Sequence, residues 1–397
     1  MILHRVPSSS SSLAAWISPS QPSVKHGIRI VSTSTFEHLS GGSALSVCSG
    51  GVPHVRVRCA SPVSIPARGP RASVDAHTRP RRGVSHERAG SHAAALGARF
   101  RNVLRVGSSR YRHRVPGPIE IPPDGFVVLD GVRFHYLDWG GDGDPLLMLA
   151  GLGCTAHVFS ELAPHLSDRF RVVALTRRGH GRTDRVQNGF ALADAAEDAR
   201  RLLDALGIER AHVVGHSMGG GEVSALAARH PERVAGVVYL DGAYDWADSP
   251  TVEWPEEAAS PDRFATYEDY VDFVHSLLPD DIRGPALDAM MRASVDTLPD
   301  GSVVDTFPTA ASAPFVRALK AFRHPYSDIT APALAIYALG DQWQGPDAIW
   351  RATCRDRFAA ETADAHVIEL HASHYVFIDR RDEVVAALRS FLTCPST

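Results

Sequence analysis

Short apolar runs alternate with amphipathic stretches along most of the chain after Ile119. The run 145–150 is continuously apolar, as expected of a strand buried on both faces of a sheet, and mainly apolar runs at 171–176, 211–214 and 234–241 predict further strands. The stretches between them carry apolar residues at helical spacing, which predicts helices over 156–166, 192–206 and 218 to about 230. Strands that alternate with helices predict an α/β fold with a mostly parallel, doubly wound sheet.

The stretch 246–326 departs from this alternation. It contains several prolines and two segments with helical spacing, 267–278 and 285–295. The strand pattern then resumes at Ala333 and ends in a helical pattern over 383–392. The interruption predicts a helical cap inserted between two strands of the sheet. The predicted division of the folded chain is a first core part at 119–245, a cap at 246–326 and a second core part at 327–397.

Residues 1–118 are rich in Ser, Arg, Pro and Gly and show little hydrophobic periodicity, which predicts a disordered tail. They hold 17 Lys and Arg against 3 Asp and Glu, whereas the rest of the chain holds 24 against 42. A targeting segment, a solvated basic tail and a start site assigned upstream of the true one are all open interpretations, and the last two are favoured. A cytoplasmic location is therefore favoured, with organellar targeting as the alternative.

The acidic balance of the remaining chain argues against nucleic acid as the partner of the folded domain. The five cysteines are widely spaced and form no Cys-x-x-Cys pair, so the sequence suggests neither a zinc ribbon nor a disulfide framework. No apolar run approaches the length of a membrane span. We expect no cofactor and no metal, and the oligomeric state stays open.

The stretch Ala211–Gly221, AHVVGHSMGGG, carries the first chemical signal. Gly-x-Ser-x-Gly between a strand and a helix is typical of a nucleophile elbow, a tight turn that holds the serine hydroxyl above the sheet. Ser217 is therefore the candidate nucleophile. The alternative is that Ser217 only caps the following helix, a position that serine favours in any case.

A serine hydroxyl needs a base to remove its proton and an acid to orient that base. His374, in the loop after the last predicted strand, is the candidate base, with His371 as its alternative. Asp341, at the end of the apolar strand that follows the predicted cap, is the candidate acid. Asp241, at the end of the preceding strand, is the alternative acid. All of these positions lie at carboxyl ends of predicted strands, where ligands of open α/β sheets gather.

The charge that develops on the substrate oxygen needs two hydrogen-bond donors aimed at one point. The backbone N–H of Met218, directly after the nucleophile, is the first candidate for this oxyanion hole. The second is the N–H of Leu152, in the loop after the 145–150 strand. Gly151 and Gly153 on either side allow a close backbone approach.

The motifs LLMLAGLG, RRGHGRTD, VVGHSMGGG, YALGDQW and HASHYVF give residues 125 to 393 a resemblance to the α/β hydrolases that have a serine nucleophile and a cap. The resemblance places Asp341 ahead of Asp241 because Asp341 matches the usual position of the acid. One feature differs: relatives commonly have His-Gly where this chain has Ala150-Gly151, so a side chain that usually braces the oxyanion loop is missing.

The resemblance implies a cofactor-independent serine hydrolase that cleaves a small or medium apolar ester through an acyl-enzyme on Ser217. C–C bond hydrolysis, lactone hydrolysis and acyl transfer use the same triad and stay open as alternatives. A ligand-binding receptor with slow turnover is the alternative from another class of protein. A group of large apolar residues in the predicted cap is expected either to line the substrate pocket or to pack the cap on the core: Trp254, Phe264, Tyr267, Phe273, Met290, Met291 and Phe315.

Overall fold

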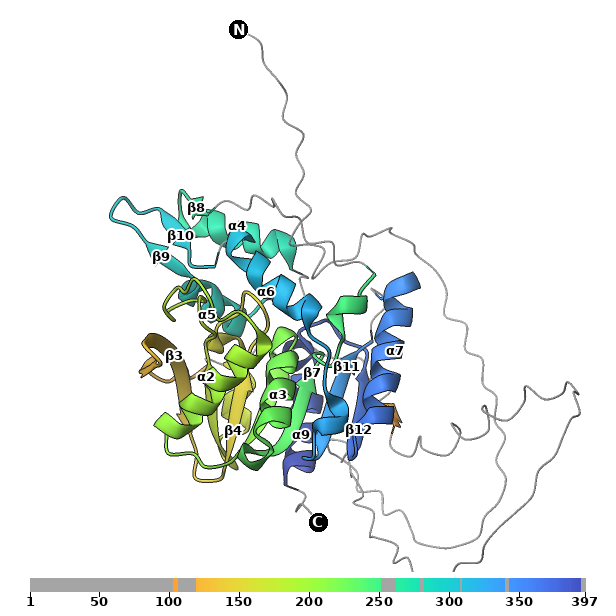
Figure 1. Ribbon diagram of the computed structural model, residues 1–397. Helices are drawn as coiled ribbons and strands as arrows, with labels where there is room; N and C mark the ends of the chain where they lie inside the picture. The colour runs from red at the N-terminus through yellow and green to blue at the C-terminus, as the bar shows by residue number, and fades with distance from the viewer. Residues whose placement is uncertain are drawn as a thin grey trace, which may run out of the picture.

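The structure is a computed structural model that describes residues 103–105, 119–250, 262–278, 282–307, 309–339 and 343–393 (Figure 1). Apart from 103–105, the predicted tail lies outside the described residues. The described part contains a nine-stranded sheet in the order β1-β12-β11-β7-β6-β4-β5-β3-β2. Its strands are β1 (Val103–Arg105), β2 (Gly125–Leu129), β3 (Val132–Gly140), β4 (Asp144–Leu149), β5 (Phe170–Leu175), β6 (Ala211–His216), β7 (Val234–Leu240), β11 (Ala333–Ala338) and β12 (Ala365–Leu370).

The first seven strands in this order, β1 to β5 across the sheet, are all parallel to their neighbours. The last two pairings, β5 with β3 and β3 with β2, are antiparallel. Parallel neighbours that are not consecutive in the chain require crossovers, and helices provide them. The predicted α/β fold with a mostly parallel, doubly wound sheet is therefore confirmed. Strand β6, which leads into Ser217, lies in the middle of the sheet, between β4 and β7.

Both faces of the sheet are buried, each by its own set of helices (Figure 1). Successive residues of a strand point to opposite faces, so Val213 and Val214 of β6 belong to two different apolar clusters. The cluster with Val213 includes residues of α2 (Leu192–Ala205), α3 (Met218–Arg229) and α7 (Gly345–Glu361). The cluster with Val214 includes residues of the 3₁₀ helix η1 (Ala156–Phe159) and of α9 (Arg381–Leu392).

The helix predicted over 156–166 is wrong. Two short 3₁₀ helices take its place, η1 and η2 (Ala163–His165). Pro164 lies within the predicted helix, and a proline in a helix interior lacks the N–H and clashes with the preceding turn. The other short helices of the described part are η3 (Pro231–Arg233), η4 (Trp246–Asp248), η6 (Tyr326–Asp328) and α8 (Val376–Asp379).

The segment between β7 and β11 is not wholly helical. Besides helices it contains a second, three-stranded sheet in the order β8-β10-β9. This segment lies over one end of the central strands in Figure 1, while the proposed domain boundaries stay predictions. Its elements are β8 (Arg263–Phe264), α4 (Tyr267–Leu277), α5 (Pro285–Ala293), β9 (Val295–Thr297), β10 (Val303–Asp305) and α6 (Thr309–Ala321).

A search of the described residues for a helix of the length and apolar character of a membrane span found none.

Candidate active site

Ser217 lies in the sharp turn between β6 and α3, as the elbow motif predicts. Its φ of 53° and ψ of −120° place it in a region that a residue with a side chain rarely adopts. Such strain persists only where the surroundings enforce it, and it is frequent at functional sites. The Ser217 side chain makes no helix-capping hydrogen bond, so the conformation is not explained by the capping alternative.

Two glycines make this turn possible. A Cβ on Gly215 would lie 2.3 Å from the carbonyl oxygen of Gly219, and a Cβ on Gly219 would lie 2.2 Å from that of Leu149. No side chain fits at either position, because both distances are far below van der Waals contact. The elbow therefore packs directly against the end of β4, which leads into the predicted oxyanion loop.

His374 lies beside the elbow and is buried. The Nε2–H of His216, the residue before the nucleophile, donates to the carbonyl oxygen of His374 over 3.1 Å, and the two rings are 4.8 Å apart. The Nδ1 of His374 forms a 2.7 Å hydrogen bond with Oδ2 of Asp241. A histidine held by a carboxylate through Nδ1 has Nε2 available as a base, which is the arrangement of the histidine and the acid in a catalytic triad.

The pairing of His374 with Asp241 changes the preferred acid. Asp341 lies outside the described residues, so its own position stays a prediction. A histidine has a single Nδ1, and in this structure that atom is already bonded to Asp241. The site geometry therefore favours Asp241, the alternative acid, over the preferred Asp341.

Asp241 is fully buried at the end of β7, where its own φ is 45°. Its Oδ1 accepts hydrogen bonds from the hydroxyl of Tyr244 and from the backbone N–H of Ala338, the latter over 2.9 Å. The buried guanidinium of Arg351 donates to both carboxylate oxygens over 3.1 and 3.2 Å. Burial alone would raise the pKa of Asp241, but the Arg351 charge and the bond from His374 outweigh it and hold the pKa below its ordinary value.

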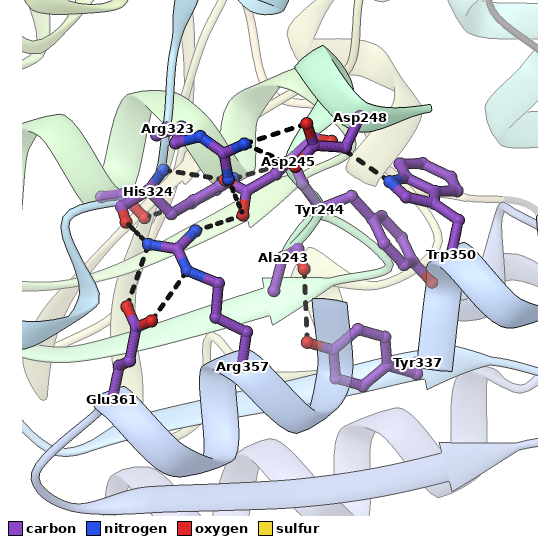
Figure 2. Close-up of polar contacts among 11 residues, drawn as sticks. Ala243, Tyr244, Asp245, Asp248, Arg323, His324, Tyr337, Trp350, Arg357 and Glu361 are labelled. Atoms are coloured by element: carbon purple, nitrogen blue, oxygen red, sulfur yellow. Dashed lines mark hydrogen bonds and ion pairs between the residues drawn. The ribbon is translucent and has the colours of Figure 1, made fainter. Parts of the chain in front are cut away.

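The segment after Asp241 is anchored by a second polar network, drawn in Figure 2. Buried Asp245 accepts a 3.1 Å hydrogen bond from the backbone N–H of His324 and forms an ion pair with Arg357 of α7. The indole N–H of Trp350, about two helical turns before Arg357 on α7, donates to the carbonyl oxygen of Asp245 over 3.2 Å. This loop is thus fixed to α7, the same helix that provides Arg351 to Asp241.

The predicted oxyanion loop is held in place on its far side by His180. The N–H of Gly153 donates to Nε2 of His180 over 3.1 Å, while Nδ1 of His180 contacts the carbonyl oxygen of Arg178 at 3.0 Å. Burial and the nearby Arg177 charge hold the pKa of His180 well below its ordinary value, so the ring is neutral and can accept at Nε2. His180 therefore supports the predicted oxyanion loop through Gly153.

The N–H of Cys154 donates to the carbonyl oxygen of Gly151 over 3.2 Å. Because the N–H groups of Gly153 and Cys154 are already bonded, Leu152 stays the candidate donor of this loop. Met218 is the first residue of α3, where an N–H has no acceptor within the helix. The assignment of both donors stays a proposal.

A brace on the oxyanion loop comes from Arg177, which sequence reasoning missed. Its guanidinium donates to the carbonyl oxygen of Ala150 over 2.6 Å and to that of Gly151 over 3.1 Å. The same side chain forms an ion pair with Glu222 of α3, and both residues are buried. Burial raises the pKa of Glu222, although the Arg177 charge opposes that shift. Arg177 therefore supplies a brace at the position where the usual histidine is absent.

The polar groups of the loop are covered by aromatic rings. The His180 ring stacks on Phe307, with centroids 3.8 Å apart, and meets Phe315 edge-on at 5.1 Å. Phe315 was one of the residues expected to line a pocket or to pack the cap. Several of the others contribute to the core cluster on the η1 face, which is the packing alternative: Phe264, Tyr267, Phe273, Met290 and Met291. Trp254 lies outside the described residues.

Sequence signals for the missed residues were weak. Arg177 is the first of two adjacent arginines in the RRGHGRTD loop, and nothing in that motif says which of the two reaches β4. Arg351 lies in a helix whose hydrophobic pattern predicts an amphipathic helix but does not show that Arg351 contacts a carboxylate. Their partners lie 45 positions away for Arg177 and 110 positions away for Arg351, so only the folded chain brings them together.

Comparisons with known proteins identify the family and the fold. Residues 144–380, more than half of the chain, match the family model described as the alpha/beta hydrolase fold. A putative non-heme haloperoxidase of Mycobacterium phage D29 is 42% identical over 118 residues, which are 30% of this chain and 42% of the relative. A bifunctional esterase/perhydrolase of Acinetobacter calcoaceticus is 38% identical over 110 residues, 27% of this chain and 40% of the relative.

The chain thus spans less than half the length of these curated relatives. Among solved structures, an E-2-(acetamidomethylene)succinate hydrolase superimposes with a TM-score of 0.58 at 22% identity, over 69% of this chain and all of the other. At that identity the likeness concerns the fold alone. The family model, the order of strands and the elbow lead to one conclusion: the chain belongs to the alpha/beta hydrolase fold family.

Proposed function

We propose that the chain is a cofactor-independent serine hydrolase that cleaves a small or medium apolar ester through an acyl-enzyme on Ser217. The observation that carries the proposal is the 2.7 Å bond between Nδ1 of His374 and Asp241, next to a serine in a strained elbow. The esterase/perhydrolase relative supports this class of reaction.

In the proposed reaction Oγ of Ser217 attacks the ester carbonyl carbon while Nε2 of His374 takes the hydroxyl proton. The N–H groups of Leu152 and Met218 stabilise the oxyanion. His374 then gives its proton to the leaving alcohol, and the acyl-enzyme forms. Water attacks this ester with His374 again as the base, which releases the acid and restores Ser217.

Asp241 is proposed as the acid that orients His374 and stabilises its charged form. Arg351 keeps the Asp241 carboxylate ionised in a site where burial would otherwise favour its neutral form. An ionised partner strengthens its hydrogen bond to the imidazolium that forms in the transition state. Arg351 thus acts through Asp241 as a positioning residue.

The preference for an apolar substrate is supported by the side chains near the oxyanion loop. A Cβ built on Gly153 would lie 3.9 Å from the Phe307 ring, so that ring covers the loop. Leu152 and Phe307 are partly buried and pack on the adjoining core cluster. Apolar side chains of this kind favour an acyl or alkyl group over a charged one.

A panel of p-nitrophenyl esters of increasing acyl length, assayed with the full chain and with Ser217→Ala, tests the proposal. We expect turnover of the shorter esters that falls by roughly 10⁴-fold or more in the variant. Hydrolysis by the Ser217→Ala variant at the wild-type rate would overturn it.

Lactones and diketones added to this panel separate the alternatives. Serine-dependent turnover of lactones or diketones without turnover of esters would replace the substrate class and keep the triad. One equivalent of product followed by lasting stabilisation of the protein would favour the receptor function instead.

A further inference from the structure

We propose that Asp124, His135 and His157 form a zinc site that is separate from the triad. Within the described part of the chain these are the only three His, Cys or carboxylate groups whose ligand atoms all lie within 4.8 Å of one another. Two imidazole nitrogens and one carboxylate oxygen are a typical donor set for Zn²⁺, which then takes a water as its fourth ligand. The inference does not depend on the proposed hydrolase activity.

The ligand atoms already lie near the spacing that zinc requires. Zn²⁺ bonds of about 2.0–2.2 Å in a tetrahedron place neighbouring ligand atoms about 3.3 Å apart. Oδ1 of Asp124 is 2.9 Å from Nε2 of His135 and 3.8 Å from Nε2 of His157. These two separations lie on either side of the required one, and all three ligand atoms lie within 4.8 Å of one another, so the site forms once the His157 ring turns.

The other ring nitrogen of each histidine has a polar partner, as is usual for histidines that bind metals. Nδ1 of His135 lies 2.8 Å from Oγ1 of Thr176, and Nδ1 of His157 lies 3.3 Å from Oγ1 of Thr155. Both contacts leave Nε2 directed at Asp124. The two imidazole rings are now parallel, so one ring has to turn before an ion can lie in the planes of both. We expect the His157 ring to turn, because its 3.3 Å contact with Thr155 is the longer of the two.

The carboxylate is oriented as well. Its other oxygen, Oδ2, forms an ion pair with Arg182. The two histidines are buried, whereas the Asp124 side chain is 25% exposed and provides a route for an ion from solvent. Without metal, Nε2–H of His135 donates to Asp124. Zinc binds the neutral ring through the Nε2 lone pair, so the ring hydrogen moves to Nδ1, where Oγ1 of Thr176 accepts it, and the ring releases no proton.

The three ligands come from three separate segments. Asp124 precedes β2, His135 lies on β3, and His157 lies in η1, directly after the oxyanion loop. A bound ion would therefore join η1 to the edge of the sheet and stiffen the segment that follows Cys154. We expect zinc to raise the melting temperature of the whole chain, because three ligands held together in the folded state bind zinc more tightly than the scattered histidines of the unfolded chain.

Isothermal titration of ZnCl₂ into the chelator-treated full chain tests this site. The chain has 20 histidines, so weak surface binding is expected and the first equivalent decides the outcome. We expect one saturable, tight equivalent in the wild type, loss of that equivalent in Asp124→Asn and in His157→Gln, and binding roughly 10–100-fold weaker in Thr155→Val. Co²⁺ titration should give the visible absorption of a four-coordinate site in the same variants that bind zinc.

His366→Gln is the matched control, because His366 also lies next to an aspartate, Asp364, at 3.2 Å but belongs to no group of three ligands among the described residues. It should keep the first equivalent. Near-UV circular dichroism of each variant shows whether it is folded. If a ligand variant does not fold, the weaker zinc binding expected of Thr155→Val still tests the site. Absence of a saturable first equivalent in the wild type overturns the proposal, as does a first equivalent that is unchanged in both ligand variants.

Discussion

Asp241 accepts hydrogen bonds from Tyr244, Ala338, Arg351 and His374, and this concentration of donors on one buried carboxylate defines the site at the scale of single residues. A structural carboxylate needs only to be neutralised. The additional bond to Nδ1 of His374 gives this one a role in orienting a base. Replacing either candidate acid by asparagine, in Asp241→Asn and in Asp341→Asn, tests this role.

Asp241→Asn should lower kcat for ester hydrolysis by roughly 10³–10⁴-fold, because an amide neither fixes the tautomer of His374 nor stabilises its charge. Asp341→Asn is the matched variant and should change kcat by only a few-fold. Steady-state kinetics on folded samples of both proteins measures the contrast. The reverse ranking would restore Asp341 as the acid.

The lowered pKa of Asp241 also makes a prediction about stability and pH. A carboxylate whose pKa is lower in the folded than in the unfolded chain adds stability above the unfolded value of 3.8, and this stability is lost as the pH falls through the folded value. Asp241→Asn leaves Arg351 buried without its charge partner, which costs about 3–5 kcal/mol.

The difference in unfolding free energy between wild type and Asp241→Asn should therefore be constant from about pH 5 to 7 and shrink below about pH 4. Urea unfolding at several pH values measures it. A difference that stays the same down to about pH 3, or that grows as the pH falls, would contradict an ionised Asp241 in the folded state.

Sequence reasoning at this scale found Ser217, His374 and both candidate acids from their places at strand ends. It ranked the acids by resemblance to the family. What decides between the two acids is which carboxylate reaches Nδ1 of His374. In the structure this contact joins His374 to Asp241, 133 positions away. No local pattern around Asp241 or Asp341 contains that information.

At the scale of elements, the oxyanion loop is joined to the nucleophile helix by one ion pair. Arg177 follows β5, Glu222 belongs to α3, and the guanidinium also bonds the carbonyl oxygens at the end of β4. The pair therefore sets the position of the loop that carries Leu152 relative to the helix that begins at Met218. The two proposed oxyanion donors can point at one oxygen only if the loop and the helix keep this relative position.

Removing both charges with Arg177→Met/Glu222→Leu tests the brace without leaving a buried charge unpaired, a replacement that is often neutral for stability. We expect kcat to fall about 10²-fold with KM little changed, because a displacement of the loop by about 1 Å costs that much. A folded double variant with wild-type kcat would show that the brace has no part in the reaction.

The neighbouring buried pair offers a matched control. Arg178 and Asp198 form two 2.7 Å hydrogen bonds but do not reach the carbonyl oxygens of β4. Arg178→Met/Asp198→Leu should therefore keep kcat within a few-fold. Equal losses in the two double variants would assign the effect to general damage of the loop.

Most elements follow from periodicity, and the exceptions have local causes. The strands β4, β5, β6, β7 and β11 and the helices α2, α3 and α9 lie within a few residues of their predicted places, because their apolar faces meet the sheet. Strand β1 was not predicted, because it lies within the stretch 1–118 that shows little periodicity. Pro164 replaces the predicted helix 156–166 by two 3₁₀ helices. The small sheet β8-β10-β9 has strands of two or three residues, too short for alternation to be read from the sequence.

At the scale of the molecule, the sheet separates two apolar clusters and carries the site at the carboxyl ends of β6, β7 and β12. The cluster on the α7 face has aromatic side chains at its centre. Phe358 is fully buried and meets Tyr239 and Tyr326 edge-on, with centroids 5.5 and 5.3 Å apart. The same helix carries Arg351, so its packing also supports the acid.

Phe358→Ala should lower the unfolding free energy by about 3–5 kcal/mol, because it leaves a large cavity in this cluster. Ile349→Ala, on the exposed side of α7 where the side chain is 70% exposed, should change it by less than about 0.5 kcal/mol. Denaturant unfolding of the two variants measures the contrast. Similar losses in both would contradict the packing of α7 on β7.

The overall architecture was predictable from the order of strands and helices, since that order alone indicates a parallel sheet. The family resemblance added the elbow and the general positions of base and acid. The braces from Arg177 and Arg351 were not predictable, because arginines with buried partners look in the sequence like the many arginines on the surface.

The central claim is that Ser217 is an activated nucleophile, and labelling with a fluorophosphonate probe followed by peptide mass spectrometry tests it most directly. We predict a single adduct on the peptide that contains Ser217. It should be absent in Ser217→Ala, formed slowly in Asp241→Asn and formed at the wild-type rate in Asp341→Asn. An adduct on a different serine, or none in a folded sample, would contradict the account.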